Sequence, residues 1–431
     1  MNGKPSKIIR TARTVQSDQS PEPQRTRLQL VLVVGAAALL VGYLAFRSVR
    51  PSNSSPELVS TGEAVATSPP PAVVMRKRHE VPPVVRVAPV SEEAANPSAQ
   101  PAASALAPAQ PPLKSAGSSA VAQELITRIS QPDFFTGGVS PQKAEELKRS
   151  LKQLGEQGVA AVPAIGEYLD RFQDLDFDAV GASRLVGYPS LRIGLLDALG
   201  QIGGPEAAEL SLQTLQKTGD AQEIAYLAKA LEKQLPPEQF RQAAVSAASE
   251  ALAQAITAQW DGRSLAPLFE VLQKYGDQSV TGVLEAAAGK WNYYATLALA
   301  GLPDGAGIPS LVRLARDPAI TGIGNGDFAL RPLAQAAMQY PEAATALVEQ
   351  ARLNQIPDSA WPTVAASLAG NYTQYGDQIF GATAPPVGWT SDQVQQRVGL
   401  IDQMLAATSN GAAQQALQNA RRTVLSKGAQ R

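Results

Sequence analysis

Few side chains in this sequence are suited to catalysis or metal binding. The chain has no cysteine, and its one histidine, His79, lies in a proline-rich stretch without helical or strand periodicity. A Ser-His-Asp triad therefore lacks its base, and a zinc site lacks both thiolate and imidazole ligands. Paired carboxylates stay open as catalytic groups, because acid pairs such as those of glycosidases follow no local spacing rule. From these residues we expect no enzyme, no metal and no cofactor.

Two short motifs resemble ligand-binding loops without meeting their requirements. Residues Asp174 to Asp178 alternate carboxylates as calcium loops do, but Ala179 stands where glycine is required and Leu185 where the bidentate glutamate is required. Residues Gly322 to Asp327 are rich in glycine, yet no strand precedes them and no lysine follows, so a phosphate-binding loop is not indicated. We interpret the first motif as a solvated loop between helices. We interpret the second as a flexible connection that ends in an Asp327 helix cap.

The segment from Gly370 to Thr390 is the strongest candidate for a recognition surface. It interrupts the helical pattern with four glycines and two prolines but carries four aromatic residues, Tyr372, Tyr375, Phe380 and Trp389. Such long loops inside helical domains are usually functional or disordered, and the aromatic residues argue against disorder. Two interpretations remain. The aromatic side chains cover the open apolar end of the helical stack, or they bind a partner, since Tyr and Trp give large contact areas at low entropy cost.

The elements that must position these residues are helices. From Ser119 onward, apolar residues recur at i, i+3, i+4 and i+7, and Gly, Pro or Asp interrupts the pattern every 12 to 20 residues. No segment has the pattern of a strand, and the apolar run from Pro82 to Val90 is broken by proline. The clearest predicted helices are Leu191 to Ile202, Glu206 to Lys217, Ala221 to Lys233 and Glu238 to Ala258.

Internal similarity indicates that the helices form repeated pairs. Residues 154–165 align with residues 199–210 at a register of 45 residues, and a third copy, residues 300–311, follows 101 residues after the second. A glycine after one helix permits a left-handed C-cap, and proline or an acidic residue opens the next helix. The last interval accommodates three helix pairs of roughly 34 residues each. Stacked pairs of this kind bury a continuous core only when several copies are present.

At Leu199 to Ala207 the chain resembles the HEAT-repeat family in its short bacterial form, with the turn Leu-Gly-x-Ile-Gly followed by Pro-x-Ala. The resemblance covers residues 145–320, although the copies at Leu154 and Ala300 depart from the pattern. It implies an all-α fold, an α-solenoid of antiparallel helix pairs, that binds other proteins and brings no catalytic residues. Tetratricopeptide repeats compete as a pair architecture, but their Trp-x-x-Leu-Gly-x-x-Tyr signature is not present. A compact, non-repeating helical domain is the remaining alternative.

An apolar run near the N-terminus predicts one transmembrane helix. No charge interrupts the 19 residues from Leu28 to Phe46, and about 20 apolar residues cross a bilayer as a helix. The alternative is a cleaved signal peptide, with which the 27 preceding residues and the large flanking side chain of Phe46 disagree. More Lys and Arg residues lie close before the run than after it, which predicts a cytoplasmic N-terminus and an extracytoplasmic domain. Ala38 and Gly42 are spaced to let two such helices approach closely.

Four segments follow from these patterns. They are a basic cytoplasmic tail (1–27), the transmembrane helix (28–46), a linker rich in Pro, Ala and Ser (47–118) and the helical domain (119–431). The linker holds 13 of the 33 prolines, and its composition is typical of disorder. Inside it, Met75 to His79 form a basic cluster, which we interpret as a solubilising feature of the tether. The functional alternative is a contact with anionic headgroups or an acidic partner.

Charge limits the partners of the helical domain. Residues 1–118 carry 13 Lys and Arg against 7 Asp and Glu, and the remainder carries 24 against 31. A domain with a net charge of −7 lacks the basic excess that phosphate neutralisation needs, so we expect no nucleic acid partner. We expect a single-pass scaffold in the inner or plasma membrane whose extracytoplasmic helical-repeat domain binds a protein, with no small-molecule substrate. The alternative is a cell-envelope carbohydrate-binding protein or carboxylate-dependent enzyme, for which the hallmark is a deep cleft with two facing acids and a stacked Trp or Tyr.

Overall fold

The computed structural model describes most of the chain from Ser119 onward and one short segment before it. The described residues are 75–77, 119–135, 138–258, 262–324, 326–372, 379–381 and 389–429. All of them belong to one of the two units into which the chain divides, Pro69–Arg431. The predicted transmembrane residues 28–46 and the linker apart from 75–77 lie outside the described residues. Among the helices that are described, none is long and apolar enough to cross a membrane.

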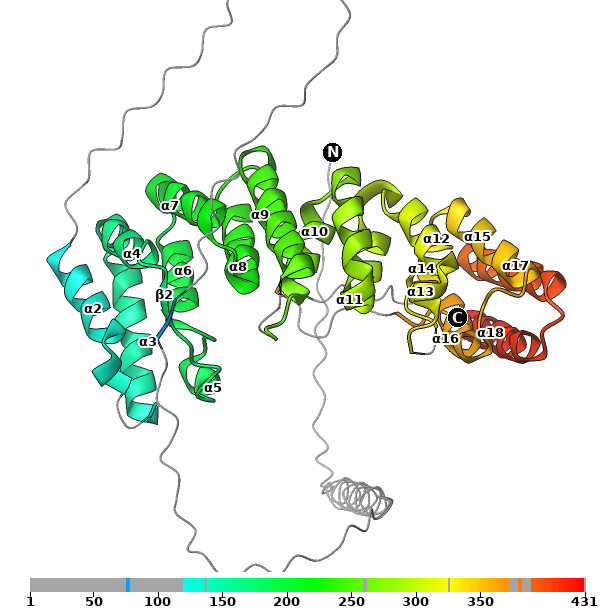
Figure 1. Ribbon diagram of the computed structural model, residues 1–431, viewed down its shortest axis with the longest axis horizontal. Helices are drawn as coiled ribbons and strands as arrows, with labels where there is room; N and C mark the ends of the chain where they lie inside the picture. The colour runs from blue at the N-terminus through cyan, green and yellow to red at the C-terminus, as the bar shows by residue number, and fades with distance from the viewer. Residues whose placement is uncertain are drawn as a thin grey trace, which may run out of the picture. The chain divides into compact units, whose positions relative to one another are not determined.

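The described unit is built from helices (Figure 1), which confirms the predicted all-α class. The four helices predicted most clearly correspond to α6, α7, α8 and α9, and their ends agree to within two residues. The helices are α2 (Ala120–Ser130), α3 (Pro141–Glu156), α4 (Val162–Leu169), α5 (Ser183–Val186), α6 (Leu191–Ile202), α7 (Gly204–Lys217), α8 (Ala221–Glu232), α9 (Pro237–Thr257), α10 (Ala266–Tyr275), α11 (Thr281–Gly301), α12 (Ile308–Arg316), α13 (Pro318–Thr321), α14 (Leu330–Ala336), α15 (Pro341–Arg352), α16 (Trp361–Leu368), α17 (Ser391–Ala407) and α18 (Gly411–Ala429).

Two short strands correct the prediction that no segment forms a strand. They are β1 (Met75–Lys77) and β2 (Gln173–Leu175), which pair antiparallel with Met75 opposite Leu175 and Lys77 opposite Gln173. The sequence pattern did not reveal β2 because three residues are too few for an alternation of apolar and polar side chains to be recognised. The pattern also did not reveal β1, because its partner strand lies nearly a hundred residues away in the sequence.

The turn between α6 and α7 shows why the repeated glycine motif specifies a helix pair. Gly203 (φ 63°, ψ −168°) ends α6, and Gly204 (φ 82°) continues in a conformation that side chains with a Cβ rarely adopt. Pro205 then occupies the first turn of α7, where its missing N–H group costs no hydrogen bond. The backbone therefore reverses within two residues, and α6 and α7 pack against each other.

The helices pack in two rows. In one row α3 contacts α6, α6 contacts α8 and α8 contacts α10, while in the other α4 contacts α7, α7 contacts α9 and α9 contacts α11. The same rule holds after residue 328, where the glycine motif is not found, because α14 contacts α16, α15 contacts α17 and α16 contacts α18. A helix in these rows therefore contacts both the other helix of its own pair and the equivalent helix of the next pair. A single cluster of buried apolar residues extends along both rows from Ala122 to Val424.

Three helix pairs occupy the interval between the second and third copies of the motif. They are α6 with α7, α8 with α9, and α10 with α11. Trp291 divides α11, because its backbone is not helical (φ −127°, ψ 49°). The second half of α11 then pairs with α12 as the third copy.

The glycine-rich motif at Gly322 to Asp327 forms the connection between α13 and α14, but Asp327 is not its helix cap. The N-cap residue of α14 is Ala329, which has no side chain to cap with. The carboxylate of Asp327 instead forms an ion pair with Arg331 one turn into α14. Asp327 is buried, so the pair with Arg331 compensates its charge where a solvent-exposed cap would have needed no partner.

Candidate functional site

Residues Gln173 to Leu175 form β2, a short strand within a domain built from helices. We call the side of β2 that faces β1 the β2 edge. The chain turns after α4 at Phe172 (φ 51°) and enters β2. Leu175 is fully buried, which fixes the strand on the core. Just beyond it, Asp176 forms a bridge with Ser190, and the amide of Phe177 donates to the carbonyl of Pro189 (2.8 Å). The strand is therefore held from the side of α6, and its other side faces β1.

Asp174 is the residue through which β2 is fastened to α6. Its carboxylate accepts a hydrogen bond from the backbone amide of Arg192 at 3.0 Å, in the first turn of α6. Only 1% of Asp174 is exposed. The interpretation of this acidic motif as a solvated loop is therefore wrong for Asp174, because the amide groups at the start of α6 supply the donor that the carboxylate needs in order to be buried.

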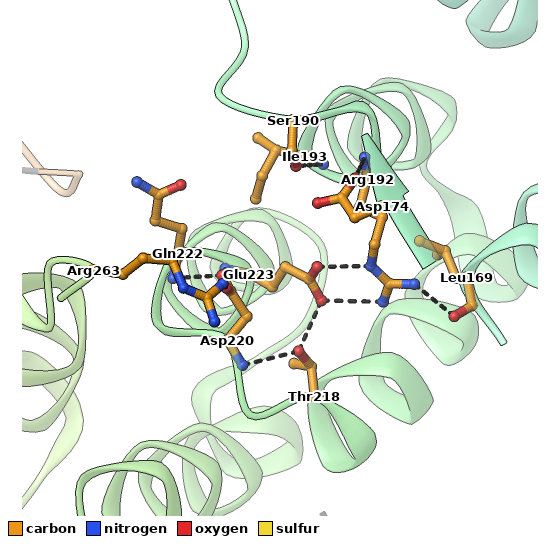
Figure 2. Close-up of polar contacts among 10 residues, drawn as sticks. All are labelled: Leu169, Asp174, Ser190, Arg192, Ile193, Thr218, Asp220, Gln222, Glu223 and Arg263. Carbon is orange, nitrogen blue, oxygen red and sulfur yellow. Dashed lines mark hydrogen bonds and ion pairs between the residues drawn. The ribbon is translucent and has the colours of Figure 1, made fainter. Parts of the chain in front are cut away.

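A buried ion pair joins three helices next to β2 (Figure 2). The guanidinium of Arg192 in α6 donates from Nε to Oε1 of Glu223 (2.7 Å) and from Nη2 to Oε2 (3.1 Å), and Glu223 lies in the first turn of α8. Its Nη1 donates to the carbonyl of Leu169 at the end of α4 (2.6 Å). Side-chain exposure is 2% for Arg192 and 0% for Glu223. This geometry is the bidentate arrangement that best compensates the loss of hydration.

The polar network continues from Glu223 to the surface. The hydroxyl of Thr218 donates to Oε2 of Glu223 (2.7 Å), and the same oxygen of Thr218 accepts from the amide of Asp220 (3.2 Å). Asp220 caps α8 by accepting from the amides of Gln222 and Glu223, each at 3.0 Å. Its second oxygen accepts from Nη1 of Arg263 at 2.7 Å. One chain of contacts therefore connects β2, α6 and α8 with the segment that precedes α10.

Arg192 and the neighbouring Tyr168 both stay protonated at neutral pH. Burial disfavours the charged guanidinium of Arg192, but the carboxylates of Glu223 and Asp174 outweigh it and raise its pKa. Burial raises the pKa of Tyr168, and the negative charge of Asp174 adds to that rise. A cation whose pKa rises and a phenol whose pKa rises both stay protonated at neutral pH. Arg192 therefore keeps the charge that its contacts with α4 and α8 require.

A cavity of about 410 Å³ borders this network on the side of α8. Among the described residues, no group of three or more His, Cys, Asp or Glu side chains is placed to hold a metal ion. The cavity is lined by Asp176, Asp178, Ala179, Pro189, Ser190, Asp220, Ala221, Gln222, Arg263 and Ser264.

The structure describes three of the four aromatic residues predicted as partner-binding. Tyr372 is exposed, with 52% of its surface accessible, and Tyr375 lies outside the described residues. Phe380 packs edge-on against Tyr275 of α10, with ring centroids 5.7 Å apart. Trp389 lies 4.5 Å from the guanidinium carbon of Arg397. The structure therefore places Phe380 and Trp389 against different helices.

Phe380 is held by its backbone as well as its ring. Its amide and that of Ile379 donate to Oε2 of Glu270 in α10 at 3.3 and 2.9 Å, and Nζ of Lys229 in α8 donates to the carbonyl of Ile379 at 2.5 Å. These partners lie in the middle of the helical rows, not at their end. The interpretation that Phe380 covers the open end of the stack is wrong, because α17 and α18 follow it and pack there instead.

A further cavity of the described region is a groove between consecutive helix pairs. The α15/α17 groove has a volume of about 880 Å³ and runs between α15 and α17 past the end of α14. Two of its lining residues are charged, and one of these, Glu349, is in an ion pair with Arg316 of α12 (2.5 Å). The lining residues are Ala337, Met338, Gln339, Pro341, Ala344, Thr345, Val348, Glu349, Arg352, Gln396, Gly399, Leu400 and Gln403.

Sequence reasoning did not single out Arg192 and Glu223. Arg192 had a recognisable signal, since it stands in the first turn of a helix whose next residues, Ile193 to Leu196, are all buried. A charged residue on a helix without a polar face needs a partner. The partner itself could not be found from the pattern, because Glu223 lies 31 residues away on α8, in a first turn where acidic residues are common.

Comparison with known proteins identifies no relative of this chain. No protein-family model, no curated protein and no solved structure matches it.

Proposed function

We propose that the protein is a membrane-anchored scaffold whose helical domain, an α-solenoid of antiparallel HEAT-like helix pairs, binds a protein partner on the extracytoplasmic side. The packing in two rows supports the solenoid, since contacts between helix i and helix i+2 are what stacked pairs make. The continuous buried cluster supports it too, because it is shared between successive pairs. The anchor rests on the uncharged run from Leu28 to Phe46 and on the basic residues that precede it.

The α15/α17 groove carries the proposal that the domain binds a protein. It crosses two consecutive helix pairs, and its floor combines small and apolar side chains such as Ala344, Val348 and Leu400 with the uncharged amides of Gln396 and Gln403. Depletion of charge at the centre of a contact surface is typical of protein interfaces. A groove between helices accepts an amphipathic helix most readily, because both present ridges of side chains at the same spacing.

The composition of this groove gives no support to a carbohydrate enzyme or binder. Glu349 is its one carboxylate, and no Trp or Tyr is among the described residues that line it. A glycosidase needs two facing acids, and sugar binding needs an aromatic face.

Site-specific photo-crosslinking in intact cells tests the proposal. A photoreactive phenylalanine analogue placed at Gln396 or Gln403, both exposed in the groove, should give one discrete adduct with a protein of the same compartment. The matched control is Gln395, which is exposed on the same helix but does not line the groove. Equal labelling from Gln395, or no adduct from any groove position in the folded protein, would contradict the assignment.

A further inference from the structure

The strand pair β1–β2 is an interaction that helical packing does not require. β1 comes from the basic cluster of the linker, and it lies antiparallel beside β2 with Arg76 opposite Asp174 and Lys77 opposite Gln173 (Figure 1). No other segment of the described chain pairs with β2 as a strand. A strand edge inside a helical domain exposes unpaired N–H and C=O groups, which an extended peptide can satisfy by adding a strand.

The receiving edge is held by contacts other than those with β1. Leu175 is buried in the core, Asp174 accepts a hydrogen bond from the amide of Arg192, the second residue of α6, and the pair Arg192–Glu223 joins α6 to α8. Because β2 keeps its extended shape through these contacts, an incoming peptide orders only itself on binding. Such preorganisation of one partner lowers the entropic cost of association.

The charges of the two segments are complementary. The linker places three cations in succession at residues 76–78, while residues 170–178 carry four aspartates and one arginine. Asp170 pairs with Lys217 and Asp174 is buried on the amide of Arg192, so the complementarity is one of net charge, and Asp178 is an exposed carboxylate that contributes to it. Proline bounds the linker segment at Pro71 and Pro82, so the ten residues between them, 72–81, are free of the residue that interrupts strand pairing. The linker segment therefore combines a proline-free stretch with a net charge opposite to that of residues 170–178.

We propose that the β2 edge is a peptide-binding site of the strand-addition type, selective for short extended basic segments, and that residues 75–77 of the same chain occupy it. The consequence for the proposed anchor is geometric. Docking at Met75 reduces the chain between Phe46 and its first attachment to the domain from 72 residues to 28. At 3.3–3.6 Å per residue, the maximum reach falls from about 250 Å to about 100 Å.

Disulfide trapping in the full-length, membrane-inserted chain tests the docking, because the natural chain has no cysteine. Lys77→Cys with Gln173→Cys joins residues that lie directly opposite each other, and Gln173 is exposed. Opposed residues in antiparallel strands have Cα atoms about 4.5–5.5 Å apart, within the range of a disulfide. The control pairs the same Lys77→Cys with Glu167→Cys, an exposed residue on α4 that does not face β1.

The opposed pair should oxidise at least about tenfold faster than the control pair, and the product should be an intramolecular crosslink, since the geometry is already that of a disulfide. Equal rates for the two pairs would overturn the docking. A crosslink found only between two chains would overturn the assignment of the occupant, because the strand would then come from a second copy.

Peptide binding tests the selectivity. The double variant Arg76→Pro/Lys77→Pro vacates the edge, since two consecutive prolines remove one ladder donor whichever side it faces. A labelled peptide of residues 72–81 should bind this full-length variant about tenfold more tightly than it binds the natural chain, in which the edge is already occupied. A peptide with glutamate at the three basic positions should not bind. Equal binding of both peptides, or equal binding to both proteins, would contradict the proposed site.

Discussion

At the scale of single residues, the pair Arg192–Glu223 is the feature on which most of the site depends. Two charges that are almost fully buried are tolerated only when each compensates the other, and here the guanidinium also satisfies the last carbonyl of α4. Replacement of both partners by apolar residues is often neutral in proteins, whereas loss of one partner is not. The pair therefore specifies how α4, α6 and α8 meet.

Glu223→Gln should lower the free energy of unfolding by about 3–5 kcal/mol, because it leaves the charge of Arg192 buried without a counter-charge. The measurement is the urea midpoint of the helical circular dichroism signal. Lys217→Met is the matched control, since it breaks the ion pair of Lys217 with Asp170 (2.9 Å), whose side chains are 50% and 61% exposed. That change should cost about 0–1 kcal/mol. Equal losses for the two variants would show that Arg192–Glu223 is not an essential pair.

Tyr168→Phe should leave stability at pH 7 unchanged or slightly higher, because the buried hydroxyl of Tyr168 makes no hydrogen bond within the described part of the chain. It should also reduce the alkaline loss of stability. Burial raises the folded-state pKa of Tyr168 above that of the unfolded chain, about 10, so its contribution is complete below pH 10 and is lost as pH rises beyond it. Thermal melts between pH 7 and 11.5 measure both effects.

Tyr188→Phe is the comparison for that experiment. Burial, together with the hydrogen bond from its hydroxyl to Asp197 (2.7 Å), raises the pKa of Tyr188 as well. This variant should also reduce the loss of stability above pH 10. At pH 7 it should lower the free energy of unfolding by about 1 kcal/mol, because the hydrogen bond is lost. If neither substitution changes the loss of stability at alkaline pH, other groups are responsible for that loss.

At the scale of elements, the loop from Gly370 to Thr390 is tied down where it is described. Trp389 lies against Gly370, whose left-handed backbone (φ 88°) leaves no space for a Cβ, and its ring faces Arg397 of α17 and Lys427 of α18. Phe380 is fixed on α8 and α10. These contacts favour a structural role for both residues. Tyr372 is the described aromatic residue that stays accessible for recognition.

Trp389→Ala should lower the free energy of unfolding by about 2 kcal/mol, less than for a fully buried tryptophan, since part of its ring is exposed. Tyr372→Ala should leave the melting temperature unchanged. Thermal melting of the two variants checks this contrast. Equal destabilisation by Tyr372→Ala and Trp389→Ala would contradict this prediction. If Tyr372→Ala alone reduces the adduct formed from Gln396, the recognition surface includes both the loop and the α15/α17 groove.

At the scale of the whole molecule, the distribution of charge and apolar residues underlies the proposed placement. Lys and Arg gather before the run from Leu28 to Phe46, and the helical domain that follows carries a net charge of −7. Basic residues flanking a spanning helix stay on the cytoplasmic side. The proposed orientation of the domain therefore rests on the first 50 residues alone.

Protease added outside spheroplasts should remove the helical domain while sparing residues 1–27, because the basic flank keeps the N-terminus inside. Antibodies against the two ends of the chain measure the outcome. Detergent lysis before protease is the control, since it should expose the N-terminal tail as well. A helical domain that survives until detergent is added would reverse the orientation.

Four of the helices could be placed from local sequence patterns, because the signals that define a helix lie within it and at its ends. Periodicity and punctuation are local, so the ends of α6 to α9 could be predicted to within two residues, and the glycines at 203 and 204 could be predicted to form a turn. The calcium-loop comparison at Asp174 to Asp178 is local in the same way, since it depends on residues at fixed positions nearby.

Contacts between residues far apart in the sequence could not be predicted in this way and are known from the folded structure. Arg192 finds Glu223 on another helix, Phe380 docks on an α10 that precedes it by more than a hundred residues, and Met75 pairs with Leu175. None of these contacts has a spacing rule, because each depends on where the packed rows bring two surfaces together. A buried charge or a three-residue strand is stable only in that context, which local sequence does not contain.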